Sequence, residues 1–371
     1  FICMVKRDIS LKVIIIGAGV IGMMQARELA QKGMEVVLID KGACGTEASW
    51  AGGGIISPLY PWRYSDPITA LASWSQAYYP NLIQTLEAES DIDPEITRHG
   101  LLMLNVADYR KAVSWSQTAD AWLEPIEQEA VYKLEPQLRD GVQRGLWMSQ
   151  VASVRNPRLL KALYKILLAH PRVEILEESA VVSLKTQGAK VIGVNTIKNE
   201  CIEADRVLIC SGAWTPQVSG QNALKIEPVK GQMVLFDAKP GMVNRVVLSG
   251  GQYVIPRRDG KVVAGSTLEY EGFDKQTTTK AKNSLADMAI DLFPQLATCP
   301  INHHWAGLRP SSPDGVPYIG RLPTYENAYV NAGHFRNGLV LAPASVRLMT
   351  SILSDETLPL DAKAYDPLAR V

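Results

Sequence analysis

The stretch Leu11-Lys12-Val13-Ile14-Ile15-Ile16-Gly17-Ala18-Gly19-Val20-Ile21-Gly22 decides the fold. Apart from Lys12, residues 11–16 form an apolar run that stops at Gly17, and such a run predicts a strand buried on both faces of a parallel sheet. Residues 20–31 have helical composition, and Gly33 is placed to end that helix. Residues 35–39 predict a second buried strand, so the chain opens with a β-α-β unit.

The glycines of this unit have the spacing of a dinucleotide-binding turn. Gly17 would make the tight turn, Gly19 would let the backbone approach a pyrophosphate, and Gly22 would let the helix pack on the strand. The phosphates would lie at the helix N-terminus, beside Val20 and Ile21. Free N–H groups and the helix dipole favour an anion at that position.

An acidic residue and a loop of small residues follow the second strand. Asp40 lies 23 residues after Gly17 and would accept hydrogen bonds from ribose hydroxyls, and its charge disfavours a phosphorylated ribose. The loop is rich in Gly, Ala and Ser, which suits contact with a flat ligand. We expect cofactor contacts from Lys41, Ala48, Ser49, Ala51, Gly52 and Gly53. Composition alone places FAD only modestly ahead of NAD.

Length and composition narrow the class of protein. A chain of 371 residues suggests two domains, and 38 basic against 38 acidic residues argue against nucleic acid or an anionic membrane as the main partner. The longest apolar run, residues 13–21, is far shorter than a membrane span. Five scattered cysteines without Cys-x-x-Cys predict reduced thiols and a cytoplasmic protein. We expect Met4 to be the natural first residue.

The remaining pattern predicts a discontinuous arrangement of two domains. Expected helices cover 65–89 (interrupted near Pro80), 107–122, 157–169, 279–293 and 338–353. Expected strands cover 100–105, 181–186, 191–197, 206–209, 229–236, 246–248, 253–256 and 261–266. Since the β-α-β unit and the last helix bracket the rest, we expect a nucleotide-binding domain of residues 1–58, 150–225 and 300–371. Residues 59–149 and 226–299 would form the second domain.

Five segments carry a family resemblance. Residues 305–310 (WAGLRP) and 312–320 (SPDGVPYIG) resemble the C-terminal signature of the D-amino-acid oxidase superfamily. Residues 332–339 (AGHFRNGL), 253–257 (YVIPR) and 211–214 (SGAW) are similar to its glycine oxidase branch, which serves thiamine biosynthesis. No single segment is diagnostic, but together they span nearly the whole chain in the right order.

The resemblance implies an α/β flavoprotein. The fold would combine a Rossmann-like FAD domain with a substrate domain built on a large mixed or antiparallel sheet. The family oxidises small amino acids with dioxygen and releases an α-keto acid, ammonia and hydrogen peroxide. Glycine is the expected substrate, with sarcosine and short D-amino acids as further candidates. The relatives with covalent flavin use a cysteine in the C-terminal half, and Cys299 lies outside the recognisable motifs, so we expect non-covalent FAD.

Three residues are expected to bind the substrate. The resemblance implies that Arg309 clamps the substrate carboxylate, which a guanidinium can bind through two hydrogen bonds. It also implies that the Tyr253 hydroxyl bonds the same carboxylate, and that Arg336 faces the substrate. Without the resemblance, Arg309 reads as a structural arginine in a turn, Tyr253 as a packing residue and Arg336 as an exposed residue near a helix start.

Further residues are expected around the cofactor. By analogy with the family, Val181 would lie on the adenine side, and Ser211, Gly212 and Trp214 would line the cofactor, although Trp214 could equally be core. The loop before the last helix would contribute His334, Phe335, Asn337, Gly338 and Leu339. We interpret His334 as a neighbour of the flavin and not as a base. His303 and His304 are interpreted as structural, and no metal site is expected.

Several alternatives stay open. The chain could be a dehydrogenase that uses a quinone or dye, the flavin domain of a tRNA-modifying enzyme, or a nucleotide-binding regulator. Zero net charge and the absent fused methyltransferase domain count against the tRNA enzyme. A homo-oligomer is compatible with the sequence. Gly250 and Gly251 put little bulk before Tyr253, and we expect them to widen the pocket.

Overall fold

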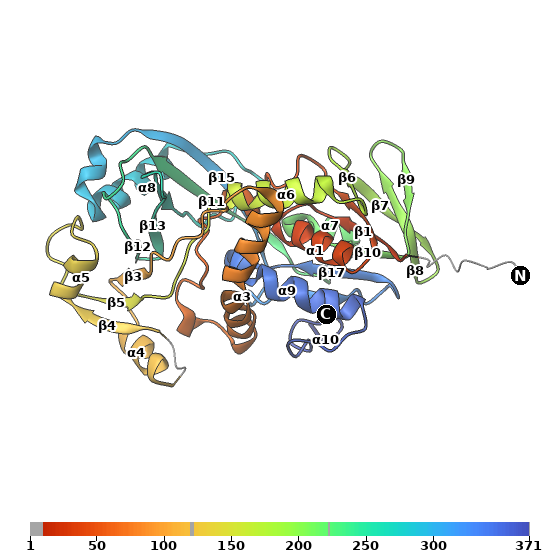
Figure 1. Cartoon of the computed structure of the whole chain (residues 1–371), viewed down its shortest axis with the longest axis horizontal. Coiled ribbons are helices and arrows are strands. Elements are labelled where there is room, and N and C mark those ends of the chain that lie inside the picture. Colours follow the sequence, from red (N-terminus) through yellow and green to blue (C-terminus); the bar gives the residue numbers. More distant parts are fainter. Residues whose placement is uncertain (1–9, 119–121, 222, 371) are drawn as a thin grey trace, which may run out of the picture.

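A computed structural model describes residues 10–118, 122–221 and 223–370. The expected start at Met4 lies outside the described residues, as does part of the helix expected at 107–122. Figure 1 shows an elongated molecule with one large sheet at each end, and with helix α3 (Asp66–Ser90) standing between the two parts. The chain passes several times between these two parts.

The first sheet has six strands and contains the β-α-β unit. Its strand order is β16-β17-β10-β1-β2-β6. All neighbours pair in parallel except β16 and β17, which are antiparallel. The bounds are β1 Lys12–Ile16, β2 Glu35–Ile39, β6 Val173–Leu176, β10 Arg206–Ile209, β16 Tyr318–Arg321 and β17 Ala328–Ala332.

Strand β1 is apolar from Val13 to Ile16 because both of its faces are buried there. Val13 and Ile15 pack into a core with helices α1 (Val20–Gln31), α6 (Asn156–Ala169) and α9 (Gly338–Leu353). Ile14 and Ile16 face a second core, which is closed by the three-stranded sheet β7-β8-β9 (Val181–Gln187, Lys190–Thr196, Cys201–Glu203). Side chains alternate across a strand, so one apolar run supplies two layers.

The second sheet has eight strands, in the order β15-β11-β14-β13-β12-β3-β5-β4. Only β12 and β3 pair in parallel, and the other neighbours are antiparallel, which confirms the expected mixed sheet. The bounds are β3 Leu101–Leu104, β4 Glu124–Glu127, β5 Arg144–Met148, β11 Glu227–Phe236, β12 Val246–Ser249, β13 Gln252–Pro256, β14 Val262–Gly265 and β15 Ile301–Ser311. Helix α8 (Thr279–Leu292) covers β11, and both contribute to one core.

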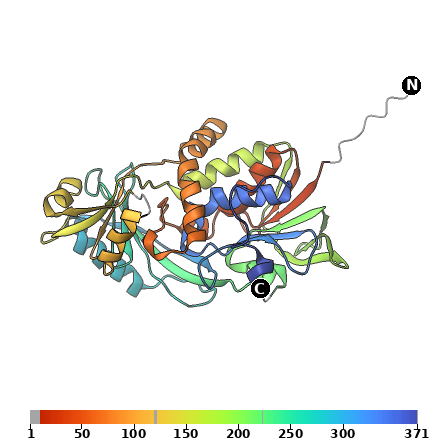
Figure 2. The ribbon, with the colours of Figure 1, turned by 90° about the horizontal axis from the view of Figure 1, so that it is seen from below.

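Short helices complete the chain. They are α2 (Ala48–Ala51), α4 (Tyr109–Thr118), α5 (Gln128–Leu134), α7 (Thr215–Ser219) and α10 (Pro367–Arg370), with 3-10 turns η1 (Pro61–Arg63), η2 (Gly212–Trp214), η3 (Pro294–Thr298) and η4 (Phe335–Asn337). Figure 2 shows α1, α6 and α9 together on one side of the six-stranded sheet.

Helix α3 differs from the sequence-based expectation. We predicted an interruption near Pro80, but the helix runs without a break from Asp66 to Ser90 with Pro80 inside it. Proline removes one helical hydrogen bond, so neighbouring packing must support this turn. Tyr79, beside Pro80, is buried and its hydroxyl donates to the Leu339 carbonyl at 2.6 Å. Tertiary packing therefore outweighs the local signal.

The expected division into domains fits the sheets only in part. Strand β15 joins the eight-stranded sheet, although residues 300–311 were assigned to the nucleotide-binding domain. Helix α3 was assigned to the second domain, but its buried face shares a core with α1 and α9. Strand β15 and helix α3 both lie at the boundary between the two parts. No sequence pattern marks this boundary. The exact division stays a prediction.

No helix within the described ranges combines the length and the hydropathy that a membrane crossing needs.

The central strands should be sensitive to loss of volume. Leu208 in β10 is fully buried, whereas Leu168 in α6 is 65% exposed. Replacing Leu208 with Ala should lower the free energy of unfolding by about 2–5 kcal/mol, because the surrounding core cannot fill the cavity. The same change at Leu168 should cost under about 0.5 kcal/mol. Denaturant titration of the holoenzyme measures both, and equal losses would contradict the assignment of the core.

Candidate active site

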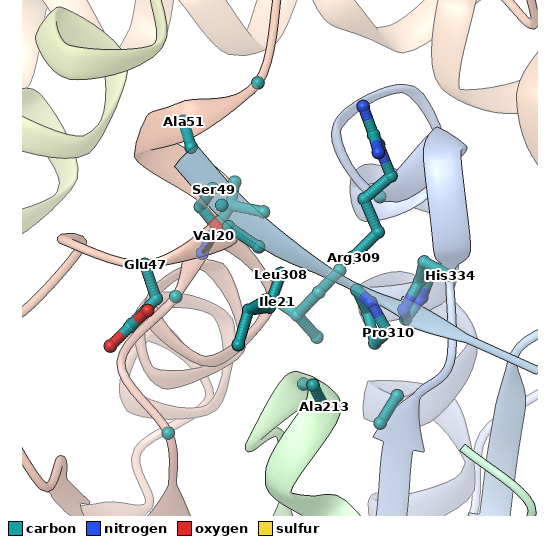
Figure 3. A pocket seen from close by; sticks show the side chains of 18 of the residues that line it. Val20, Ile21, Glu47, Ser49, Ala51, Ala213, Leu308, Arg309, Pro310 and His334 are labelled. Carbon is teal, nitrogen blue, oxygen red and sulfur yellow. Dashed lines mark hydrogen bonds between the residues drawn. The ribbon is translucent and has the colours of Figure 1, made fainter. Parts of the chain in front are cut away.

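One large cavity lies between the two sheets and has a volume of about 510 Å³. It collects residues from distant parts of the chain. Figure 3 shows Val20 and Ile21, Glu47 and Ser49, Ala213, and Arg309 and His334 around the same space. The sequence-predicted residues that line it are Gly17, Gly19, Val20, Ile21, Asp40, Lys41, Ala48, Ser49, Ala51, Gly52, Gly53, Val181, Ser211, Gly212, Trp214, Tyr253, Arg309, His334, Phe335, Arg336, Gly338 and Leu339.

Two predicted residues lie next to the cavity without lining it. Gly22 faces the first turn of the unit, where an added Cβ would sit 1.8 Å from the Gly17 carbonyl oxygen. Only hydrogen fits there, so Gly22 lets helix α1 begin close to strand β1. Asn337 is buried behind the loop at the start of α9. Both residues therefore support the wall of the cavity without lining it.

The glycine turn leaves a helix N-terminus open to the cavity. Gly17 has φ of +107°, and a Cβ there would meet the Cys210 carbonyl oxygen at 2.5 Å. No side chain caps α1 at Gly19, although the Val20 N–H donates to Ser49 Oγ at 2.9 Å. An uncapped helix start presents N–H groups and the positive end of the dipole to an anion.

Asp40 directly follows β2 at the same edge of the sheet. Its carboxylate accepts hydrogen bonds from the Ala18 N–H at 2.6 Å and the Gly42 N–H at 3.0 Å. Burial raises the pKa of Asp40, while these two hydrogen bonds and Lys41 oppose the rise. A carboxylate has about four acceptor sites, so two donors leave acceptors that face the cavity.

The loop of small residues is held by Asn156. Its Nδ2 donates to the carbonyls of Ser49 at 2.8 Å and Gly52 at 3.1 Å. On the other side, a Cβ at Gly53 would lie 3.0 Å from Tyr253 Cε2. The loop is therefore pressed between α6 and the eight-stranded sheet. No sequence signal marks Asn156 as part of the site, because an asparagine at a helix start resembles an ordinary cap.

A strap formed by residues 267–278 reaches from the eight-stranded sheet to the nucleotide side of the cavity. Lys275 Nζ lies 3.0 Å from Glu47 Oε1, and the rings of Phe273 and Trp214 are 5.4 Å apart. Lys41 Nζ lies 3.3 Å from the centre of the Trp214 ring. Trp214 is thus packed between the Lys41 cation and Phe273 of the strap, and both Lys41 and Trp214 line the cavity.

The start of α9 forms another wall. The helix begins at Gly338 with no side-chain cap from Asn337, so its positive end faces the cavity. His334 is 2% exposed and its Nε2 lies 3.1 Å from Ser345 Oγ on α9. Burial lowers the pKa of His334 to about 3. The ring is neutral at physiological pH, which agrees with a structural position and not with a strong base.

Arg309 projects from β15 and is anchored in place. Its Nη1 donates to the carbonyls of Lys230 at 3.3 Å and Thr267 at 3.2 Å, and its Nη2 donates to Ser266 Oγ at 2.6 Å. Burial lowers the pKa of Arg309, an effect that the neighbouring Tyr253 opposes. Within the described part of the chain, no carboxylate lies within ion-pair distance of Arg309. A guanidinium has five N–H donors, so donors remain for a ligand.

Tyr253 and Arg336 lie around the same guanidinium. Tyr253 is 7% exposed and stands on β13, with its ring against Gly53. Arg336 is exposed, and its Nη2 approaches the Gly251 carbonyl at 3.5 Å. Its positive charge also lowers the pKa of Arg309. The structure therefore brings together the three residues that the sequence assigned to the substrate.

Gly231 and Ser266 are parts of this site that sequence analysis missed. A Cβ at Gly231 would lie 2.2 Å from Arg309 Nη2, so the guanidinium fills the space beside this glycine. An isolated glycine within the strand 227–236 signals such a close approach and could have revealed it. Ser266 gives no signal, because a serine at a strand end is ordinary.

The two glycines before Tyr253 have a different role from the one expected. Gly250 and Gly251 form the turn between β12 and β13, with φ of +57° and +85°. Neither lines the cavity, and a Cβ at either position would meet nothing within 4 Å. Turn geometry explains these glycines, because side chains other than hydrogen are strained at such angles. The expectation that they widen the pocket is wrong.

The comparisons with known proteins agree on the family. A family model described as FAD dependent oxidoreductase (DAO) matches residues 12–352. Glycine oxidase of Pseudomonas aeruginosa is 46% identical over 362 residues, covering 97% of this chain and 99% of the relative. Glycine oxidase of Pseudomonas putida is 44% identical, covering 98% and 100%. The crystal structure of glycine oxidase from Geobacillus kaustophilus superposes with a TM-score of 0.88 at 26% identity, covering 96% and 98%.

The chain belongs to the DAO family of FAD-dependent oxidoreductases. The expected fold is thereby confirmed, and so is FAD as the cofactor. Within this family the chain is an FAD-dependent amino-acid oxidase.

The residues of the cavity fit FAD. The open end of α1 suits the pyrophosphate, and the free acceptors of Asp40 suit a ribose. Two further buried oxygens, Asn156 Oδ1 and Asn331 Oδ1, have no hydrogen-bond partner in the described structure, and both residues line the cavity. Buried polar atoms without partners are costly, so a polar ligand that reaches them would be favoured.

Gly22 should be decisive for binding the cofactor. An alanine at residue 22 forces α1 away from the Gly17 carbonyl, and overpacking of this kind costs about 1–3 kcal/mol. FAD should bind the Gly22→Ala variant about 5- to 100-fold more weakly. Gly42→Ala is the matched control, because a Cβ at Gly42 meets nothing within 4 Å. Fluorescence titration of the apoproteins measures both, and equal affinities would refute this role.

Proposed function

We propose that the chain oxidises glycine. Overall, glycine, water and dioxygen would give glyoxylate, ammonia and hydrogen peroxide. The observation that carries the proposal is the half-buried Arg309 guanidinium, which lines the cavity beside Tyr253. Among the described residues no carboxylate lies within ion-pair distance of this cation, so it favours an anionic ligand, and an amino acid provides a carboxylate. The glycine oxidases of two Pseudomonas species support glycine as the amino acid.

Arg309 and Tyr253 would fix the orientation of the substrate. Two hydrogen bonds from the guanidinium and one from the phenol would hold the carboxylate in a plane. Ser266 and the carbonyls of Lys230 and Thr267 keep the guanidinium from rotating. Because these donors are fixed, a substrate that binds them has its α-carbon held in a defined position. Such positioning is the main contribution of a protein to cofactor chemistry.

When bound, FAD would supply the redox chemistry, taking a hydride from the substrate carbon and passing the electrons to dioxygen. The amine must be neutral for this step, and His334 is too buried to accept its proton. The positive end of α9 would stabilise negative charge that develops in the cavity. Arg336 lies at the mouth, where it would attract the anionic substrate. We assign catalysis to orientation and electrostatic field, with no side chain acting as a base.

Sarcosine and short D-amino acids stay secondary candidates. Gly250 and Gly251, which were expected to widen the pocket for these substrates, do not line the cavity. The walls near Arg309 are instead formed by Met233, Tyr253 and Leu308. Glycine, which has no side chain, needs the least space beside these three residues.

We also propose that FAD is held without a covalent bond. Cys299 lies 3.6 Å from Met242 in the core under α8 and does not line the cavity. Cys210 lines the cavity, but burial raises the pKa of its thiol, which disfavours the nucleophilic thiolate.

Acid precipitation should therefore release the yellow chromophore into the supernatant. Its absorption and mass should be those of free FAD. Colour that stays with the precipitated protein would contradict a non-covalent cofactor. The Cys210→Ser variant would then show whether this thiol forms the bond.

Arg309 should dominate binding of the substrate. Arg309→Ala should raise the KM for glycine at least about 10- to 100-fold, since a charged hydrogen bond contributes about 1.5–3 kcal/mol. Arg309→Lys should also lose affinity, because an ammonium lacks the planar fork. The carboxylate inhibitor glycolate should weaken in parallel, while the flavin spectrum stays nearly unchanged.

A second arginine provides the control for this experiment. Arg321 is exposed at the end of β16, outside the cavity, so Arg321→Ala should keep the KM of the parent. Peroxide should appear in step with glyoxylate, which distinguishes an oxidase from an enzyme that uses a quinone. If Arg309→Ala binds glycolate as well as the parent does, Arg309 does not bind the carboxylate, and Arg336 becomes the leading candidate for that role.

A further inference from the structure

Met233 is a methionine whose sulfur lies inside the substrate-binding part of the cavity. It stands on β11 two residues after Gly231, lines the cavity and is 2% exposed. The Tyr253 hydroxyl donates to its Sδ at 3.9 Å. The side chain also packs on Gly265, where a Cβ would come within 2.9 Å of Met233 Cγ and Cε. The thioether is thus held beside the proposed carboxylate clamp.

This position distinguishes Met233 from the other methionines of the described chain. Met103 and Met349 are fully buried away from the cavity, and Met34 and Met288 are partly exposed on the outside. Among the described residues, Met233 alone brings a methionine sulfur to the cavity lining. An oxidant that forms inside would meet this thioether before it reaches bulk water.

The chemistry of an amino-acid oxidase supplies such an oxidant. A thioether reacts with hydrogen peroxide to give a sulfoxide and water. The sulfur lone pair forms a bond to one peroxide oxygen, the O–O bond breaks, and the departing hydroxide takes up the second proton as water. Sulfur loses two electrons and peroxide gains two. The donors of Tyr253 and Arg309 are placed to stabilise the departing hydroxide.

We propose that Met233 is a self-oxidation site, converted to methionine sulfoxide by the peroxide that the enzyme itself releases. This inference rests on the proposed oxidation of glycine by dioxygen. The sulfoxide oxygen accepts hydrogen bonds more strongly than the thioether sulfur, so it competes with the substrate carboxylate for the Tyr253 hydroxyl. Accumulated turnover would therefore weaken substrate binding, and reduction of the sulfoxide would restore it.

Peptide mass spectrometry after turnover tests the proposal. The holoenzyme is incubated with glycine in air, with excess catalase in the solution. Oxidation of Met233 should exceed that of Met34 and Met288 at least about fivefold, because confinement in the cavity replaces dilution in bulk. During turnover without catalase, the outer methionines should be oxidised as well as Met233. With added peroxide and no glycine, the outer methionines should be oxidised before Met233. Enzyme without glycine, and enzyme with glycine but no dioxygen, should show no increase.

Kinetics provide the second readout. In the parent, the KM for glycine should rise severalfold with the fraction of Met233 sulfoxide, and kcat should fall less. Met233→Leu conserves volume and lacks sulfur, so its KM should stay constant over the same number of turnovers. Met103→Leu, on strand β3 of the same sheet and outside the cavity, should drift like the parent.

The outcomes separate this inference from the proposed function. Peroxide formed from glycine in air, together with unmodified Met233 after many turnovers, would overturn the self-oxidation site alone. No peroxide from glycine would overturn the proposed oxidase reaction, and the arm with added peroxide would then still show whether Met233 is reactive. Oxidation of Met233 that catalase abolishes would show attack from bulk solution, which also contradicts the proposal.

Discussion

A positive charge in the cavity wall, without a paired carboxylate among the described residues, is the constraint on which the site depends. Arg309 is half-buried and its hydrogen bonds go to neutral acceptors, namely two carbonyls and the Ser266 hydroxyl, while the charge of Glu269 acts on it from beyond ion-pair distance. The remaining guanidinium donors are left for a ligand. Keeping the guanidinium there requires an open space beside Gly231, a tightly paired β11 and β15, and a second wall carrying Tyr253. The positive charge in the cavity wall therefore favours an anionic ligand, such as the carboxylate of an amino acid.

The N-terminal unit could be predicted from sequence almost residue by residue. Its signals are local, since an apolar strand, spaced glycines and an acid lie within 30 consecutive residues. Helix α1 and strands β2 and β10 have the expected bounds for the same reason. The substrate residues Arg309 and Tyr253 came from resemblance and not from pattern, because a single arginine or tyrosine carries no local information on its ligand.

What sequence could not predict depends on contacts between distant segments. The uninterrupted α3 is supported by packing on α9, and the membership of β15 in the second sheet is decided by its long pairing with β11. Gly250 and Gly251 were misread because glycine in a turn and glycine in a pocket look alike in sequence. No sequence pattern predicts the contact of the strap either, because Lys275 and Glu47 are separated by 228 positions.

The order of the strands also limits how this architecture can be divided. The chain passes from the six-stranded sheet to β3–β5, back to β6 and β10, out again to β11–β15, and returns to β16 and β17. Four crossings mean that no single cut releases either half as a contiguous piece. Gene fusion or exchange of modules could therefore add material at the ends or in surface loops, but could not transplant the substrate half alone. Diversity in substrate choice must arise by substitution within the cavity walls.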